Sequence, residues 1–432
     1  MHSAEDWYEL PLPEIERQQA EGKEVALRAD AAFAKPETPL FSPELALVAS
    51  LLCLEPERHM MRESEVEIGN SQLGAAPVKN YFVGMLSLVL LCTMAIPNVS
   101  RAQGSMAKAQ PHLDKAKAAA WKPGDGLNDL THLYETVCAP ALSAKGPDND
   151  EKPQPPAQHR TPPREDWYQE PAKVFDNLYW LGSWGSATRV PANPGGDSTW
   201  AVTTSEGIIL IDSGYDYSAP ILITGGLKKL GLDPTQIKYV IISHAHSDRY
   251  WGAKYLQDTY KAHIILSEID WNGIKISTDP EDVKPKKDMV ATDGMKLTLG
   301  DTTLTTYLTP GHTPGTISTL VPLKDGNQHH LGAVWGGINP TLYGHGVRNG
   351  QTVQEVAKTW SASAARFRDI ADKAGADTYL AIHPFYDNLL EKIHFIQYRK
   401  PGEPHPMVSK DNLDRFLTII KECSDAQVAR LE

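Results

Sequence analysis

Cysteine is scarce in this chain, and basic residues form no stripe. Only four cysteines occur among 432 residues, and 42 basic residues face 54 acidic ones, which gives a formal net charge of -12. A phosphate backbone is bound through clustered lysine and arginine, and this chain has no such cluster. The composition therefore excludes nucleic acid as an expected partner and is that of an ordinary soluble protein.

Long apolar runs are also rare, and the one that stands out is Tyr81–Pro97. Lys79 precedes it and the small-residue segment Ser100–Ala102 follows, the pattern of a secretory signal peptide over residues 78–102. The run is shorter than the roughly 20 residues of a typical membrane span. We therefore expect a periplasmic or secreted protein with no stable membrane span after cleavage. A signal anchor or a buried helix is the alternative.

The 77 residues ahead of this segment are unusual, because export signals stand at the start of a chain. A valine codon serves as a start in bacteria, and Val78-Lys79-Asn80 would then form a normal beginning for the signal. Our hypothesis is that residues 1–77 are a mis-set start or a dispensable extension, disordered or partly helical.

Signal cleavage after Ala102 would leave two cysteines, Cys138 and Cys423. In an oxidising compartment this pair favours a disulfide between the amino-terminal segment and the last helix. Two unpaired buried thiols are the alternative. Neither cysteine has metal-ligand spacing.

The mature chain divides at a proline-rich stretch. Residues 103–164 contain helix-permissive segments followed by the linker Lys145–Arg164, and residues 165–432 alternate strand and helix patterns. The expected strands are Leu178–Leu181, Thr199–Thr204, Gly207–Asp212, Tyr239–Ser243, His263–Leu266, Lys296–Leu299, Thr302–Leu308, Ile317–Val321, Leu331–Trp335 and Thr378–Ile382. The expected helices are Ala219–Leu230, Tyr250–Tyr260, one from Ser267, Thr352–Lys373 and Asp411–Leu431. Two strand-rich halves with helices outside predict an α/β fold, a four-layer αββα sandwich.

Four histidines follow expected strands. His244 and His246 are two apart in IISHAHSD, so an extended loop places both imidazoles on one side, and Asp248 enters the first turn of the next helix behind Ser247 as N-cap. His312 lies in TPGHTPG and His383 in YLAIHP. One histidine after a strand is usually a satisfied structural residue. Four of them together with the aspartate indicate a zinc site.

These motifs resemble the metallo-β-lactamase superfamily, whose signature is HxHxDH with isolated ligand histidines downstream. The resemblance extends over roughly Val174–Ile396, includes GIILIDSG and the DWNG at Asp270, and is greatest to subclass-three β-lactamases, which lack a ligand cysteine. It implies one zinc on His244, His246 and His312.

The resemblance implies a second zinc on Asp248, residue 249 and His383. Many glyoxalase-type and lactonase-type relatives bridge two metals with an aspartate after a later strand. Here Leu331–Trp335 runs into Gly336-Gly337 without a carboxylate, which favours the lactamase branch.

Arg249 stands where the family has a histidine, and a guanidinium has no lone pair to donate. Two unit charges about 4 Å apart repel by about 4 kcal/mol at an effective dielectric near 20, and a dication roughly doubles this. We expect one zinc, with the second weak or absent. Three interpretations of Arg249 are open. It occupies the space of the second metal and presents its charge to a substrate carboxylate, or zinc binds there with Asp248, His383 and waters alone, or the site is degenerate in a protein that has lost its activity.

The resemblance implies a small-molecule substrate, a β-lactam, which a class B type enzyme hydrolyses. Such hydrolysis is a cause of antibiotic resistance. A zinc-bound hydroxide attacks the carbonyl, Asp248 is the general acid/base, and Arg249 or a metal offsets negative charge. Asp212 resembles the family's acid that holds the second ring nitrogen of a ligand histidine. The alternative is that Asp212, at the end of a strand, only caps a turn. The segment that would line the mouth of the active site contains Trp335, Tyr343 and His345. Packing is the alternative role of these three side chains.

Two rival functions remain open. One is hydrolysis of another ester, lactone or thioester on the same fold, and the other is a non-catalytic descendant that has lost its metal centre. The natural substrate and the oligomeric state do not follow from the sequence.

Overall fold

The computed structural model describes residues 105–143, 161–184, 196–338 and 351–432, all of which belong to one compact unit, Lys79–Glu432. Residues 1–77, the expected signal peptide and most of the linker lie outside the described residues. Among the described helices, none combines the length and apolar character that crossing a bilayer requires.

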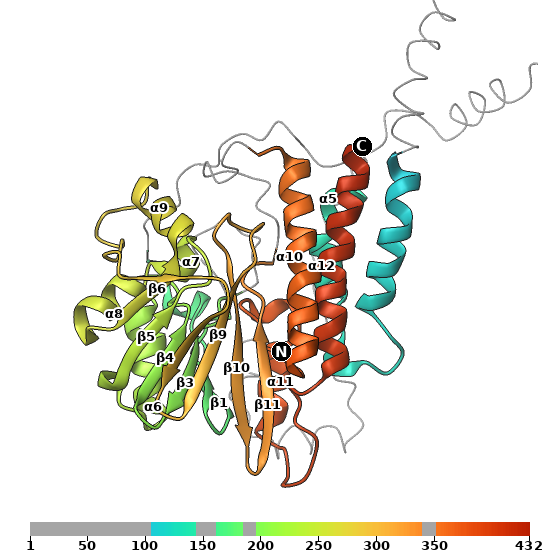
Figure 1. Ribbon diagram of the computed structural model, residues 1–432. Helices are drawn as coiled ribbons and strands as arrows, with labels where there is room; N and C mark the ends of the chain where they lie inside the picture. The colour runs from blue at the N-terminus through green and yellow to red at the C-terminus, as the bar shows by residue number, and fades with distance from the viewer. Residues whose placement is uncertain (1–104, 144–160, 185–195, 339–350) are drawn as a thin grey trace, which may run out of the picture. The chain divides into compact units, whose positions relative to one another are not determined.

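Two sheets form the centre of this unit (Figure 1). The first has seven strands in chain order: β1 Ala172–Phe175, β2 Leu178–Trp180, β3 Trp200–Thr204, β4 Gly207–Ile211, β5 Ile237–Ile241, β6 His263–Ser267 and β7 Met289–Ala291. Strands β1 to β4 pair antiparallel, and β4 to β7 pair parallel. The parallel half brings the carboxyl ends of β4, β5 and β6 to one edge, where ligands commonly bind.

The second sheet has the order β12-β11-β10-β9-β8. Its strands are β8 Met295–Leu299, β9 Thr302–Leu308, β10 Ile317–Asp325, β11 Gln328–Val334 and β12 Thr378–Tyr379. All neighbours pair antiparallel except β11 and β12, which are parallel.

Helices cover the outer faces of both sheets. Figure 1 shows α8 and α9 beside the first sheet and α10 and α12 beside the second. The helices are α4 Thr131–Val137, α5 Ala139–Leu142, α6 Gly226–Lys229 after a π-helical turn, α7 Ser247–Tyr250, α8 Ala253–Tyr260, α9 Glu268–Ile276, α10 Val353–Ala374, α11 Leu389–Ile396 and α12 Lys410–Leu431. The layers are therefore helix, sheet, sheet, helix, the αββα sandwich expected from the sequence.

Strand β4 is a continuous apolar run because both of its faces are buried. Ile209 and Ile211 face the core between the sheets, whereas Ile208 and Leu210 face the helices on the outer side. Both faces of the strand are buried, so alternation between apolar and polar residues is not needed. The strand sits centrally, and its end carries Asp212 into the site.

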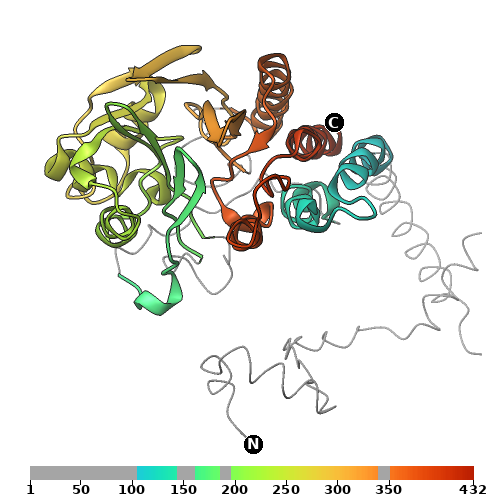
Figure 2. The same cartoon turned by 90° about the horizontal axis from the view of Figure 1, so that it is seen from below.

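The helical residues 105–120 and the helices α4 and α5 pack along α12, as Figure 2 shows from below. Leu113 and Leu133 belong to the same core cluster as Phe416 of α12. Cys138 and Cys423 form a disulfide and are both fully buried. The disulfide expected from the cysteine count is confirmed.

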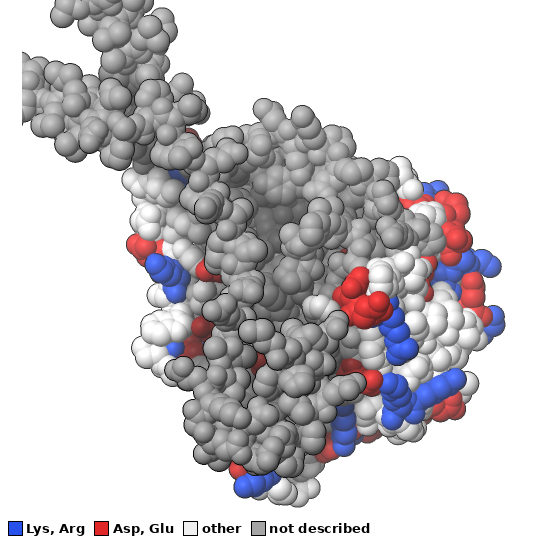
Figure 3. Space-filling view, turned by 180° about the vertical axis from the view of Figure 1, so that it is seen from behind, with Lys and Arg blue, Asp and Glu red and all other residues white. Residues whose placement is uncertain are grey.

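Acidic and basic side chains are interspersed on the coloured part of the face shown in Figure 3. Many lysine and arginine side chains of the described residues form ion pairs with carboxylates, such as Arg366 with Asp293 and Arg399 with Asp325.

Candidate metal centre

Two loops at the edge of the sandwich carry three histidines. His244 and His246 follow β5, and His312 lies between β9 and β10. The backbone N–H of Ile317, at the start of β10, donates to the carbonyl of Ser243 at 2.7 Å, which joins the two loops directly. The site is therefore fixed by main-chain contacts between the two sheets.

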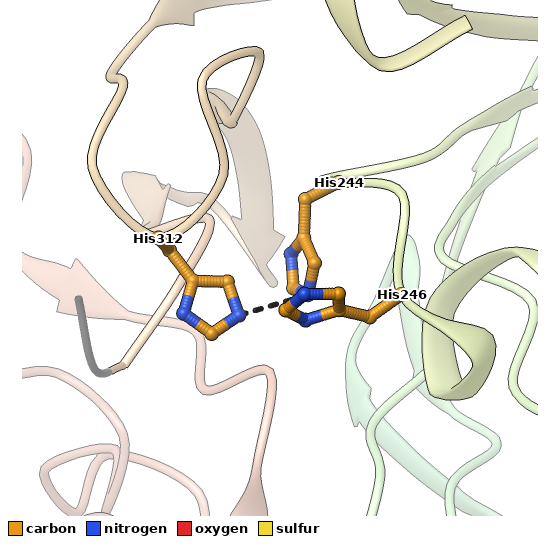
Figure 4. Close-up of side chains that lie close together, drawn as sticks. All are labelled: His244, His246 and His312. Carbon is orange, nitrogen blue, oxygen red and sulfur yellow. Dashed lines mark hydrogen bonds between the residues drawn. The ribbon is translucent and has the colours of Figure 1, made fainter. Parts of the chain in front are cut away.

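The three imidazoles converge in the way the sequence predicted (Figure 4). Ring centroids are 4.7 Å apart for His244 and His246, 4.2 Å for His244 and His312, and 4.8 Å for His246 and His312. The Nε2 atoms of His244 and His312 are 3.1 Å apart, and one nitrogen from each of the three residues lies within 4.8 Å of the others. Three imidazoles at this separation fit the ligand set of one zinc ion.

The ring of His244 is oriented for this role. Its Nδ1 lies 2.7 Å from the carbonyl oxygen of Gly336, so Nδ1–H donates there and Nε2 presents its lone pair to the cluster. Burial holds the pKa of His244 well below its usual value, and the neighbouring His312 and His246 lower it further. The neutral imidazole is the form that binds a metal.

Asp212 does not hold a histidine directly, contrary to one of the two sequence interpretations. Its Oδ1 accepts from the N–H of Ser243 at 2.7 Å and its Oδ2 from the Ser243 hydroxyl at 3.0 Å, and that hydroxyl lies 3.1 Å from His244 Nδ1. Burial raises the pKa of Asp212 to about 6 in spite of Arg249. The carboxylate therefore fixes the start of the loop, and acts on His244 through Ser243.

Asp270, on α9, joins the two histidine loops. Oδ2 accepts from the N–H of Ala245 at 2.9 Å and from the Thr313 hydroxyl at 2.7 Å, while Oδ1 accepts from the N–H of Gly315 at 3.0 Å. Ser267, the expected first residue of this helix, is its N-cap, and α9 begins one residue later at Glu268. From the sequence, the DWNG segment at Asp270 was noted only as part of the family resemblance, and its role in joining the two histidine loops was not predicted.

Gly337 allows His312 to reach the cluster. A Cβ at Gly337 would lie 2.2 Å from the Cβ of His312, closer than non-bonded carbons approach. A Cβ at Gly336 would lie 2.0 Å from the carbonyl oxygen of Ile317. Both glycines after β11 are thus required by packing.

A second group of donors consists of Asp197, Asp248 and His383, whose donor atoms lie within 4.8 Å of one another. Asp248 lies in the first turn of α7, with His246 rather than Ser247 at the N-cap position, so the predicted cap is one residue off. His383 follows β12, and its Nδ1 donates to the carbonyl of Gly196 at 2.7 Å. The structure brings Asp248 and His383 together as the sequence predicted.

Arg249 is fully buried, and protein oxygens surround its guanidinium. Nη2 donates to Asp197 Oδ1 at 2.5 Å and to Asp248 Oδ2 at 2.8 Å, and Nη1 donates to the carbonyl of Ile382 at 2.8 Å. The first interpretation placed this charge against a substrate carboxylate, and the structure contradicts it. A buried guanidinium needs hydrogen-bonded counter-charges, which the protein itself provides.

The charges in this group control one another's protonation. Burial raises the pKa of Asp197 well above its usual value, against the attraction of Arg249. Burial would also raise the pKa of Asp248, but Arg249 and His383 together hold it well below its usual value. Burial and Arg249 lower the pKa of His383 to about 4. Of the two carboxyl groups, Asp248 is therefore the one that ionises at the lower pH.

Asp197 was missed by the sequence interpretation. Its backbone N–H donates to the Ser183 hydroxyl at 3.0 Å, and its carbonyl accepts from the N–H of Ser183 at 2.7 Å. A Cβ at Gly182 would lie 2.1 Å from that carbonyl, and Gly196 has a positive φ of 52°. The Gly-Gly before the aspartate was the available signal, but such pairs are common in loops.

Trp335 is buried and packs against Trp360 and Phe367, so the packing interpretation is confirmed. Tyr343 and His345 lie outside the described residues.

Comparison with known proteins shows what this arrangement is similar to. Residues 192–325 match the Metallo-beta-lactamase superfamily. The chain is 35% identical over 109 residues to the N-acyl homoserine lactonase AttM of Agrobacterium fabrum (strain C58 / ATCC 33970), a match that covers 23% of this chain. The chain spans about 41% of the length of that curated relative.

Solved structures of similar proteins include two metallo-beta-lactamases. One is the native FEZ-1 enzyme from Legionella gormanii, with 25% identity, a TM-score of 0.47 and coverage of 58% of this chain and 91% of that chain. The other is BJP-1, a subclass B3 enzyme of Bradyrhizobium japonicum, with 26% identity, a TM-score of 0.49 and coverage of 62% and 98%.

Proposed function

We propose that this chain is a hydrolase of the metallo-beta-lactamase fold and that it opens the ring of a cyclic amide, a β-lactam, with zinc held by His244, His246 and His312. The convergence of these three imidazoles is the observation that carries the proposal. A zinc ion bound there supplies an acidified water and a Lewis acid.

The residues around the histidines supply the remaining functions. Asp248 is ionised and lies beside the histidines, where it accepts the proton of the attacking water and returns it to the leaving nitrogen. The water oxygen bonds to the carbonyl carbon, the carbon–nitrogen bond breaks, and the nitrogen takes up one proton. Arg249 orients Asp248 through their 2.8 Å hydrogen bond rather than binding substrate.

The choice between ring types depends on two observations. Gly336 and Gly337 follow β11 where the lactonase-type pattern has a carboxylate, which favours a β-lactam. The similarity to AttM over 109 residues favours a lactone as the second candidate. Both reactions add water to a ring carbonyl, so the same residues serve either substrate.

The test compares His246→Ala with His263→Ala. His263 is an exposed histidine of β6 paired with Asp288, so its removal controls for the loss of an imidazole elsewhere. We expect the purified wild-type protein and His263→Ala to bind zinc and to hydrolyse a chromogenic cephalosporin. His246→Ala should lose more than about 100-fold in kcat/KM, because even groups that only orient ligands are worth 10–100-fold.

An N-acyl homoserine lactone, assayed in parallel, separates the two candidates. Turnover of the lactone alone would replace the β-lactam proposal by the lactonase one. A wild-type protein that binds no zinc would refute both.

A further inference from the structure

The guanidinium of Arg249 touches every member of the second donor group. Its Nη2 is 2.5 Å from Asp197 Oδ1, 2.8 Å from Asp248 Oδ2 and 3.4 Å from both ring nitrogens of His383. Apart from this nitrogen, the three residues are a group of two carboxylates and an imidazole at metal-binding separation. One nitrogen atom of the chain thus contacts the whole set.

This nitrogen is held in place from its other side. Nη1 donates to the carbonyl of Ile382 at 2.8 Å and lies 3.4 Å from Asp212 Oδ2, and the Arg249 side chain has 0% exposure. Rotation of the side chain out of the group would break these bonds and leave buried carboxylates without a counter-charge. The cation is therefore a fixed part of the site.

We propose that Arg249 Nη2 is an internal cation that takes the place of a second metal ion, with Asp197, Asp248 and His383 as its ligand-like partners. The inference rests on the proposed function, because it presupposes a metal ion on His244, His246 and His312. A second dication among the same donors would meet the guanidinium at contact distance, and like charges repel. The protein then holds one ion.

Asp197 makes this substitution possible. The guanidinium carries one positive charge and three carboxylates surround it, those of Asp197, Asp212 and Asp248. Asp197 is bound to Ser183 through its main chain and is 7% exposed, so it is built to receive a buried charge. An arginine, unlike a metal ion, is not removed by a chelator, so Asp248 keeps its orientation in the metal-free protein.

The experiment counts zinc ions per chain in the full-length protein. Protein stripped with a chelator is titrated with zinc alone, and bound zinc is measured after removal of the free ion. We expect one equivalent for the wild type and two for Arg249→His, because the new imidazole would join Asp197, Asp248 and His383 as a fourth donor. Arg368→His is the matched control, since Arg368 also pairs with a carboxylate, Asp414, but on the surface.

Each outcome decides between the inference and the proposed function. Two equivalents in the wild type would overturn the inference and leave the proposed function standing, and this measurement needs no variant to fold. One equivalent in a folded Arg249→His protein would overturn it as well. No zinc in the wild type would refute the proposed function and the inference with it. A second equivalent in Arg368→His would show that any introduced histidine adds zinc, and would also overturn the inference.

Discussion

Gly337→Ala is expected to remove zinc from a folded protein. The new Cβ would lie 2.2 Å from His312 Cβ and 2.3 Å from its Cγ. Non-bonded carbons sit at about 3.5–4.0 Å, so His312 or the loop of Gly337 must move by more than about 1 Å. Zinc–nitrogen bonds tolerate about 0.2 Å, so a displaced His312 no longer shares an ion with His244.

The stability of the same variant should fall only modestly. Overpacking of this kind costs about 1–3 kcal/mol, because the displaced loop lies at the edge of the sandwich and its neighbours relax. Zinc affinity should therefore fall much more than the melting temperature. Competition with a chromogenic chelator measures the first and circular dichroism melting the second.

Gly225→Ala is the matched control. A Cβ at Gly225 would be 3.7 Å from the carbonyl oxygen of Pro220, an ordinary contact, and the residue is helical. We expect unchanged zinc binding and a gain of up to about 1 kcal/mol in stability. Wild-type zinc affinity in Gly337→Ala would refute the claim that close packing at this glycine positions His312.

Two further predictions concern stability. Reduction of the Cys138–Cys423 disulfide, which spans a sequence separation of 285 residues, should lower the free energy of unfolding by about 2–5 kcal/mol. Thermal melts with and without a reductant measure this, and a Cys138→Ser/Cys423→Ser variant that responds equally to the reductant would contradict it. Burial raises the pKa of Asp270 to about 6. Between about pH 4 and 6 the folded protein therefore keeps a proton on Asp270 that the unfolded chain has released. The free energy of unfolding consequently falls as the pH rises through this range. The stability of the wild type relative to Asp270→Asn should therefore fall by up to about 3 kcal/mol from about pH 4 to pH 7, and equal pH profiles in urea unfolding would exclude this effect.

The strands were predictable wherever both faces are buried or apolar and polar residues alternate clearly. β9 has the predicted bounds Thr302–Leu308. β12 ends at Tyr379 although the apolar pattern continues to Ile382, because the chain leaves the sheet and the carbonyl of Ile382 binds Ser198 and Arg249 instead. The edge strands β1 and β7 of the first sheet were not predicted.

The histidine cluster was predictable because its ligands follow strands and match a spaced motif. The environment of Arg249 was not, since all of its partners except Asp248 come from distant segments. Asp197 lies 52 residues away in sequence from Arg249, and Ile382 lies 133 residues away. The sequence shows the charge of an arginine but not whether that charge faces a cleft or carboxylates of the protein, which only the tertiary structure decides.

The bond between Cys138 and Cys423 also imposes an order on biosynthesis. Chains grow at about 5–20 residues per second, so Cys138 is made roughly 14–57 s before its partner. Helices α4 and α5 are among the first described elements to be synthesised. The helix that they pack against, α12, is synthesised last. The earliest part of the described chain therefore reaches its final covalent state only when almost all of the rest has been made.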